Sequence, residues 1–167
     1  FKSVVEFFRQ TLFLFSFYRR RTEDVVRFVE WVPREVPEYI ERSVNRGRGV
    51  ILVTAHYGSW DSGGAAVANI ATTHVVQEVF NSSAVNEITK RLRLSKGMLT
   101  IPMTNVKRLM RVLRRGGVVA VLADRPVPGR GVDVEFFGCT TSVPAGTARL
   151  CYQRNVPIIA GVIKLHR

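Results

Sequence analysis

Residues 47–61 read GRGVILVTAHYGSWD, and the sequence pattern changes there from helical to strand-like. Within this stretch, residues 50–54 form a short apolar and β-branched run, which predicts a buried strand. Before it, residues 2–20, 23–31 and 35–46 predict helices, with breaks at Pro33 and Pro37. We therefore expect a helical N-terminal region and the first strand of a sheet at residue 50.

After this strand, candidate helices and strands alternate along the chain. Strands are predicted at 74–80, 99–101, 118–123, 132–137 and 157–165, and helices at 61–71, 84–96, 105–115 and 145–154. Such alternation predicts an α/β fold with a central, mostly parallel sheet flanked by helices. We expect an N-terminal helical region over residues 1–46 and a single α/β core over residues 47–167. Because the chain begins with Phe1 and not with methionine, we also expect truncation at both ends.

Composition limits the classes of protein to consider. With 167 residues, 46% of them hydrophobic, the chain is neither disordered nor a disulfide-rich miniprotein. Lysine and arginine number 25 against 13 acidic residues, a net charge of +12. This excess indicates an anionic partner, such as nucleic acid, an acidic protein, a phosphorylated cofactor or an anionic membrane. The two cysteines, Cys139 and Cys151, form no CxxC motif, so we expect no metal site.

The first predicted helix, residues 2–20, is rich in bulky apolar side chains and ends in Arg19, Arg20 and Arg21. An aromatic helix that ends in basic residues suits a membrane interface. The alternative is a core helix whose basic end is favoured by the helix dipole. Its longest apolar run, from Thr11 to Tyr18, is too short to span a bilayer.

The first candidate site lies directly after the strand at 50–54. His56 stands at the carboxyl end of this strand, where open α/β sheets bind ligands. Asp61 follows five residues later, so the two side chains can meet only if the chain turns, which Gly58 permits. A histidine held by a carboxylate is a general base. The alternative is a buried histidine, with Asp61 as a helix N-cap.

No activated nucleophile accompanies this pair. Ser59 lies in the same segment, but the chain has no GxSxG motif. A histidine–carboxylate pair without a protein nucleophile fits direct attack by a substrate hydroxyl or by water.

A second candidate site is the loop 124–131, which follows the strand at 118–123. Its Arg125 and Arg130 suit a phosphate or carboxylate, although a solvated turn is the alternative. In the next strand, alternation puts Asp133, Glu135 and Phe137 on one face. Glu135 is therefore either a functional carboxylate or an edge-strand charge.

The helix at 105–115 combines an apolar and a basic face. Its expected core positions are Val106, Leu109, Met110 and Leu113, and its basic residues are Lys107, Arg108, Arg111, Arg114 and Arg115. The basic face is either merely solvated or a dock for an acidic carrier, cofactor phosphates or anionic lipid headgroups. The sequence has no recognisable nucleic-acid motif, no P-loop and no metal-ligand spacing.

Four segments together resemble the bacterial lipid A biosynthesis acyltransferase family, including its phosphatidylinositol mannoside acyltransferase branch. They are residues 47–61, with the histidine–four-residues–acid motif, residues 93–98, residues 124–138, which end in Phe-Phe-Gly, and residues 143–150. The resemblance runs from about residue 47 to the end of the chain and implies a glycerolipid-acyltransferase-like core.

The resemblance implies transfer of a fatty acyl chain from acyl-CoA or acyl-carrier protein to a glycolipid hydroxyl, without a cofactor or metal. His56 would take the proton, Asp61 would orient His56, and Glu135 would assist through its charge. Arg93, Arg125 or backbone amides near Gly58 would stabilise the oxyanion. The expected substrate-binding set is Arg93, Asp124, Arg125, Gly58, Arg130 and Arg149. The protein is expected at the cytoplasmic face of the bacterial inner membrane, as a peripheral protein that binds no nucleic acid.

Two other functions are compatible with this sequence. The same site could hydrolyse an acyl thioester with water in place of the acceptor. The chain could also be a non-catalytic basic module that binds a membrane or nucleic acid.

Overall fold

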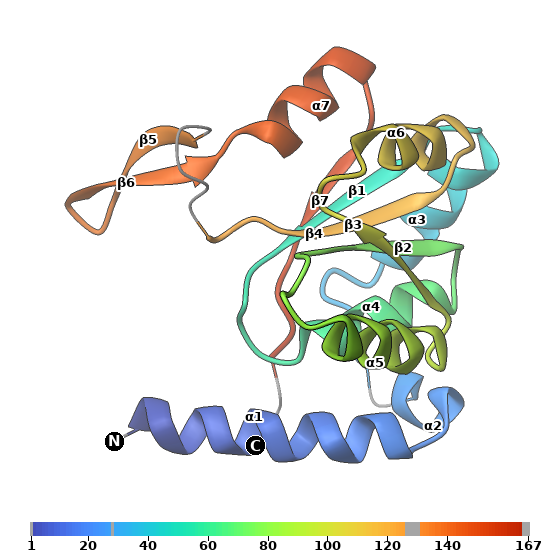
Figure 1. Ribbon diagram of the computed structural model, residues 1–167. Helices are drawn as coiled ribbons and strands as arrows, with labels where there is room; N and C mark the ends of the chain where they lie inside the picture. Colours follow the sequence, from blue (N-terminus) through green and yellow to red (C-terminus); the bar gives the residue numbers. More distant parts are fainter. Residues whose placement is uncertain (1, 28, 126–130, 165–167) are drawn as a thin grey trace.

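The fold is built on a five-stranded sheet, seen in a computed structural model that describes residues 2–27, 29–125 and 131–164 (Figure 1). The strands are β1 (Val50–Thr54), β2 (Thr73–Gln77), β3 (Met98–Pro102), β4 (Val118–Leu122) and β7 (Ile158–Ala160). They lie in the order β3-β2-β4-β1-β7, and every pairing between them is parallel. The predicted α/β class with a central parallel sheet is confirmed.

Helices cover both faces of this sheet. They are α1 (Lys2–Arg19), α2 (Thr22–Val26), α3 (Val36–Asn45), α4 (Trp60–Ala68), α5 (Ser83–Leu94), α6 (Val106–Arg114) and α7 (Gly146–Arg154). We call the side of α6 and α7 the upper face and the side of α1, α4 and α5 the lower face, as Figure 1 shows them. Right-handed crossovers between parallel strands place helices on both faces in this way.

Alternation along β1 assigns its side chains to the two faces. Val50 and Leu52 pack with residues of α3 and α4 below the sheet. Ile51 packs above it with Val119 of β4 and Leu113 of α6. Both faces of this strand are therefore apolar, which explains the continuous apolar run in its sequence.

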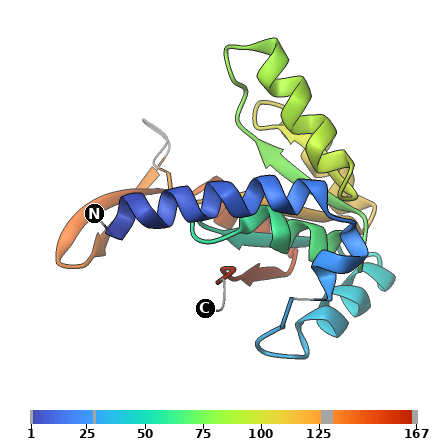
Figure 2. The same ribbon diagram turned by 90° about the horizontal axis from the view of Figure 1, so that it is seen from below.

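Helix α1 lies along the lower face, beneath α4 (Figure 2). Phe17 is buried against Ala65 and Met98, so the C-terminal part of this helix belongs to the core. Lys96, just after α5, donates a hydrogen bond to the Arg20 carbonyl, and its ammonium lies 5.3 Å from the centre of the Phe17 ring. None of the helices in the described part of the chain combines the length and the apolar character that a membrane crossing requires.

A separate hairpin projects beside the sheet (Figure 1). It consists of β5 (Gly131–Phe136) and β6 (Cys139–Pro144), which pair antiparallel. The sequence pattern predicts the first of these strands but not β6. Phe137, expected in the strand, lies in the two-residue turn with φ 52°, and Gly138 follows with φ 74°. Two positive φ values are what a tight hairpin turn requires.

Several other elements are shorter than predicted, among them the strand expected at 74–80, which ends at Gln77. The helix expected at 23–31 is confined to Thr22–Val26, and residues 29–31 are not helical. The last strand, expected at 157–165, covers only Ile158–Ala160, with residue 165 outside the described part. In contrast, the helix ends expected at Gly97 and Gly116 are confirmed, because both glycines adopt the left-handed conformation that follows a helix.

Candidate active site

The register of two neighbouring strands brings His56 and Asp124 together. Strands β1 and β4 are adjacent and parallel, with Thr54 opposite Leu122. His56 and Asp124 each stand two residues beyond these positions, so both lie at the carboxyl edge of the sheet. Their side chains meet there: His56 Nδ1 lies 2.8 Å from Asp124 Oδ1. The backbone N–H of His56 also donates to Asp124 Oδ2, at 2.8 Å.

These two contacts define how the His56 ring is held. A carboxylate can only accept, so Nδ1 carries the hydrogen and Nε2 is left with a lone pair. The Trp60 ring packs against the imidazole at a centroid distance of 5.2 Å and an angle of 68°. The His56 side chain is still 31% exposed, so a substrate can reach it. The arrangement suits a general base acting through Nε2.

Asp124 is held in its charged form by the same contacts. Partial burial acts to raise the pKa of this carboxyl, but the hydrogen bonds from the backbone and ring of His56 outweigh burial. The net effect is a pKa below the usual value for aspartate. The carboxylate therefore stays ionised next to the ring, where it stabilises an imidazolium.

Gly58 fixes the path of the loop between His56 and α4. Its φ is +63°, and it forms a parallel β-bridge with Ile163 near the end of the described chain. A Cβ at this position would lie 1.6 Å from the Ile163 carbonyl oxygen. Glycine is therefore required twice, for its conformation and for the close approach. The chain turns at Gly58, but the turn does not bring Asp61 to His56.

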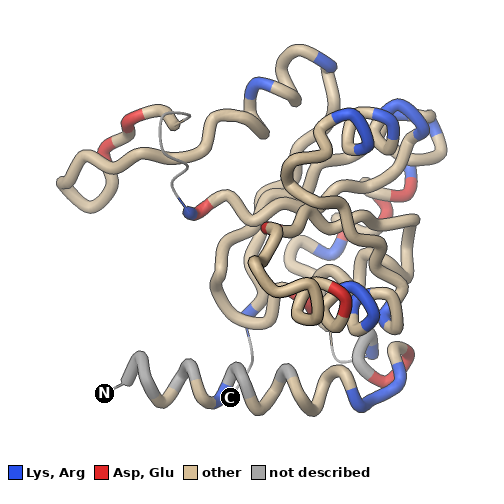
Figure 3. Tube along the Cα trace, viewed as in Figure 1, with Lys and Arg blue, Asp and Glu red and all other residues tan. Residues whose placement is uncertain are grey.

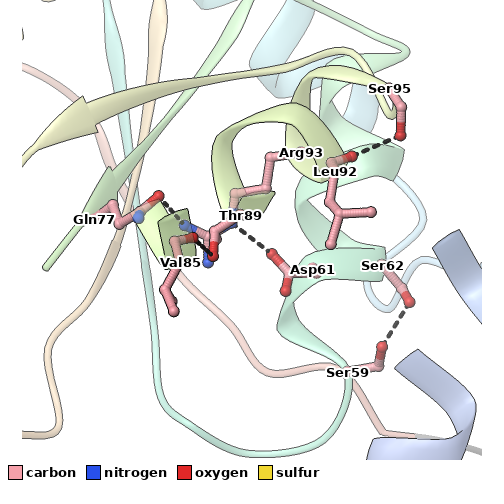
Figure 4. A network of polar contacts seen from close by, with 9 residues as sticks. All are labelled: Ser59, Asp61, Ser62, Gln77, Val85, Thr89, Leu92, Arg93 and Ser95. Atoms are coloured by element: carbon pink, nitrogen blue, oxygen red, sulfur yellow. Dashed lines mark hydrogen bonds and ion pairs between the residues drawn. The ribbon is translucent and has the colours of Figure 1, made fainter. Parts of the chain in front are cut away.

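Asp61 belongs to a different network, beneath the sheet (Figure 4). It lies in the first turn of α4, and its carboxylate accepts a hydrogen bond from Arg93 Nε at 3.0 Å. Arg93 also donates to Gln77 Oε1 at 3.1 Å. The Tyr18 hydroxyl contacts the same pair, and burial with the nearby Asp61 carboxylate raises the pKa of Tyr18 well above its ordinary value. The network ties α1, α4, α5 and β2 together.

The structure thus pairs His56 differently from the prediction. The expected His56–Asp61 contact is replaced by His56–Asp124, and Asp61 is paired with Arg93. The physical reason is that α4 begins at Trp60, so Asp61 turns into the lower layer while His56 stays at the sheet edge. Asp124, predicted as a substrate-binding residue, is the partner of the ring. Asp124 follows β4 by two residues, just as His56 follows β1 by two residues. This match identifies Asp124 as the partner of His56 only when the order of the strands in the sheet is known.

The other predicted site residues are spread over the molecule. Arg93 is buried and engaged with Asp61, so its guanidinium is not presented to a substrate. Arg125 is exposed beside Asp124, with its Nη1 3.5 Å from Glu78 Oε2. Arg149 lies exposed on α7, and Glu135 lies exposed on the hairpin strand β5, where it faces Thr140 rather than His56. Arg130 lies outside the described residues.

In residues 2–27, 29–125 and 131–164, no three His, Cys, Asp or Glu side chains are grouped as metal ligands.

The Asp61–Arg93 pair leads to a prediction about stability. Both side chains are about nine-tenths buried, so removing one charge leaves the other without a partner. We expect Asp61→Asn to lower the free energy of unfolding by about 3 kcal/mol, measured by urea denaturation. Glu38→Gln, which breaks an exposed pair with Arg42, should change it by less than about 1 kcal/mol. An Asp61→Asn variant of wild-type stability that is inactive would place Asp61 in the chemistry instead.

Comparison with known proteins identifies relatives of the chain. A family model described as bacterial lipid A biosynthesis acyltransferase matches residues 3–166. Two curated relatives are named phosphatidylinositol mannoside acyltransferase. The one from Mycobacterium tuberculosis (strain ATCC 25618 / H37Rv) is 27% identical over 128 residues, or 73% of this chain and 40% of the relative. The one from Mycolicibacterium smegmatis is 29% identical over 127 residues, or 72% and 42%. The matched part is therefore about two fifths of each relative's length.

Proposed function

This chain belongs to the bacterial lipid A biosynthesis acyltransferase family, and we propose that it transfers a fatty acyl group from an acyl thioester to a glycolipid hydroxyl. The observation that carries the proposal is the His56–Asp124 pair at the carboxyl edge of the sheet. Within the described residues, no serine or cysteine is hydrogen bonded to His56. The arrangement therefore supports a base that activates a hydroxyl of the substrate and forms no acyl-enzyme.

In the proposed reaction, the acceptor hydroxyl gives its proton to Nε2 of His56 as its oxygen attacks the thioester carbonyl. A tetrahedral intermediate with one oxyanion forms. Its collapse restores the carbonyl, breaks the carbon–sulfur bond and releases the thiolate. The thiolate takes a proton from the imidazolium, which returns His56 to its neutral form. The products are an ester and a free thiol.

Asp124 lowers the energy of this path by holding the ring and by stabilising the imidazolium that forms. The oxyanion needs hydrogen-bond donors, and two are close to the pair. Arg125 is the next residue after Asp124, and the loop amides around Gly58 belong to the segment that carries His56. Arg93 is not one of them, because it is buried and donates to Asp61 and Gln77.

We propose that α1 attaches the protein to a membrane surface at the cytoplasmic face of the bacterial inner membrane. Its C-terminal part faces the sheet through Phe17, and the large apolar side chains on its other side are exposed. These are Val5, Phe8, Leu12 and Phe15. They recur at helical spacing, and exposed Arg19, Arg20 and Arg21 follow them. An apolar stripe beside basic residues is the pattern of a helix that lies in the lipid interface.

The names of the relatives support the choice of acceptor class. Since two of them are named phosphatidylinositol mannoside acyltransferases, we propose a glycolipid of that kind as the acceptor. The proposed donor is an acyl thioester of coenzyme A or of a carrier protein. A thiolate is a good leaving group, so the site needs no strong acid to assist its departure.

A second candidate is an acyl-thioester hydrolase, because water can also reach the partly exposed His56. A thiol-release assay with palmitoyl-coenzyme A, with and without a membrane glycolipid extract, separates the two functions. We expect thiol release that depends on the lipid, with one acylated lipid formed for each thiol. Release at the same rate without lipid would identify a hydrolase. No release from either donor class would contradict both.

A further inference from the structure

Trp60 restrains the orientation of the His56 ring. The imidazole makes a hydrogen bond with Asp124 at Nδ1 and an edge-to-face contact with the Trp60 ring, at a centroid distance of 5.2 Å. A hydrogen bond at Nδ1 holds one atom of the ring but tolerates a tilt of its plane, since hydrogen-bond angles are broadly distributed. Two aromatic rings in contact prefer an offset or edge-to-face geometry, which restrains that tilt. Trp60 therefore helps to aim Nε2, the atom that takes the proton.

The start of α4 carries Trp60 and Asp61 in different directions. They are the first two residues of this helix, and successive residues of an α-helix are turned by about 100°. The Trp60 ring reaches His56 at the sheet edge, whereas the buried Asp61 carboxylate points into the lower layer (Figure 4). A contact that fixes Asp61 therefore also fixes the turn that presents Trp60 to His56.

Asp61 is held by two side chains in the lower layer. Arg93 Nε donates to its carboxylate at 3.0 Å, and both groups are about nine-tenths buried. The Tyr18 hydroxyl forms hydrogen bonds with both, as a donor to the carboxylate and an acceptor from the guanidinium. Burial and the nearby carboxylate raise the pKa of Tyr18 well above its ordinary value, so the hydroxyl keeps its hydrogen and stays a donor. Tyr18 thus completes a group of three polar side chains beneath the turn at residues 60 and 61.

Tyr18 comes from α1, the helix that we propose attaches the protein to a membrane. The residues around it hold this end of α1 on the core, because Phe17 is buried and Lys96 donates to the Arg20 carbonyl. The basic run 19–21 follows Tyr18 directly, and Figure 3 shows it in blue at this end of the helix. The contact with the first turn of α4 and the residues suited to anionic lipid headgroups therefore lie at the same end of α1.

We propose that Trp60 and Tyr18 are positioning residues for the base His56: Trp60 orients the imidazole, and Tyr18 holds the turn that carries Trp60. The inference rests on the proposed function, because the orientation of the ring matters to the reaction only if Nε2 takes the proton. Neither residue exchanges a proton with the substrate. Removing either contact should slow the chemical step, because a general base must lie within hydrogen-bond reach of the proton that it abstracts. Binding of donor and acceptor should be unaffected.

The first test measures kcat and KM for lipid-dependent thiol release with palmitoyl-coenzyme A. Trp60→Leu removes the ring and should lower kcat about tenfold or more, with KM within about twofold of the unmodified value. Trp60→Phe keeps an aromatic ring beside His56 and should recover kcat to within about threefold of the unmodified protein. Tyr18→Phe removes only the hydroxyl and should lower kcat about three- to tenfold. The matched control is Tyr39→Phe, which removes the hydroxyl of an exposed tyrosine on α3 and should leave kcat unchanged.

The second test reads the Trp60 side chain directly through its fluorescence. The chain has two tryptophans, Trp31 and Trp60, so Trp31→Phe leaves Trp60 as the single emitter. In this background we expect Tyr18→Phe to lower the steady-state anisotropy of Trp60 and to shift its emission, because the ring gains freedom. Tyr39→Phe in the same background should change neither signal. A role of Tyr18 in stability alone would leave both signals unchanged in the folded protein.

Three results would overturn the proposal. The first is a kcat within about twofold of the unmodified value in either Tyr18→Phe or Trp60→Leu, when circular dichroism shows that the variant is folded. The second is a Trp60→Phe variant as slow as Trp60→Leu, which would show that an aromatic contact with His56 is not what the reaction needs. The third is a slow Tyr18→Phe variant with unchanged Trp60 fluorescence. If Trp60→Leu does not fold, the kcat and the fluorescence of Tyr18→Phe decide the question.

His56→Ala separates this inference from the proposed function. If His56→Ala keeps its transfer activity, the proposed chemistry fails, and the fluorescence of Trp60 still shows whether Tyr18 holds the turn. If His56→Ala is inactive while Tyr18→Phe and Trp60→Leu transfer at the unmodified rate, the chemistry stands and the positioning role fails.

Discussion

Replacing His56 by alanine is expected to lower the rate of acyl transfer by about 10²- to 10⁴-fold. The substitution removes the lone pair on Nε2 that accepts the proton of the attacking hydroxyl. The ring is partly exposed and lies outside the described hydrophobic clusters, so the fold should persist. The effect should appear in kcat, because the proton is transferred only in the chemical step.

The measurement is the initial rate of thiol release with acceptor lipid at saturating donor. Asn81→Ala, in the exposed connection between β2 and α5, is a suitable control and should keep the unmodified rate. A folded His56→Ala variant with more than about a tenth of the unmodified rate would remove His56 from the role of base.

Asp124→Asn is the second substitution with a large expected effect, a loss of about 10²- to 10⁴-fold in kcat. The amide cannot stabilise the imidazolium, and its N–H₂ group can donate to Nδ1, which moves the ring hydrogen to Nε2. The base would then present a hydrogen to the acceptor hydroxyl where it needs a lone pair. The side-chain volume is nearly unchanged, so packing should be preserved.

The matched control for Asp124→Asn is Asp133→Asn, an exposed carboxylate on the hairpin strand β5. Both variants lose one negative charge, but only Asp124 contacts His56. Equal and small losses in the two variants would show that general electrostatics, and not the contact with the ring, explains the effect.

Much of the fold could be predicted from local signals. The apolar runs at β1 and β4 are buried on both faces, so they are recognisable without tertiary information. The hairpin was harder, because β6 is polar and half exposed and carries no strong strand pattern. Its partner β5 was predicted as a strand, but nothing local shows that it leaves the main sheet.

The site was predictable only in part, because its geometry depends on strand order. His56 was identified from its place after a strand, and that place is confirmed. Its partner was assigned to Asp61 because the two are close in sequence. The neighbour in space is Asp124, 68 residues away, since β4 lies beside β1 in the sheet. Asp61 is closer to His56 in sequence, but it lies in the first turn of α4 and points into the lower layer.

The measurement that tests the central claim most directly is a double-mutant cycle on His56 and Asp124, read as kcat for lipid-dependent thiol release. If the two side chains act as one base, the variant with both His56→Ala and Asp124→Asn should be no slower than His56→Ala alone. Losses that multiply, so that the double variant is slower by the product of the two single effects, would show that His56 and Asp124 act independently.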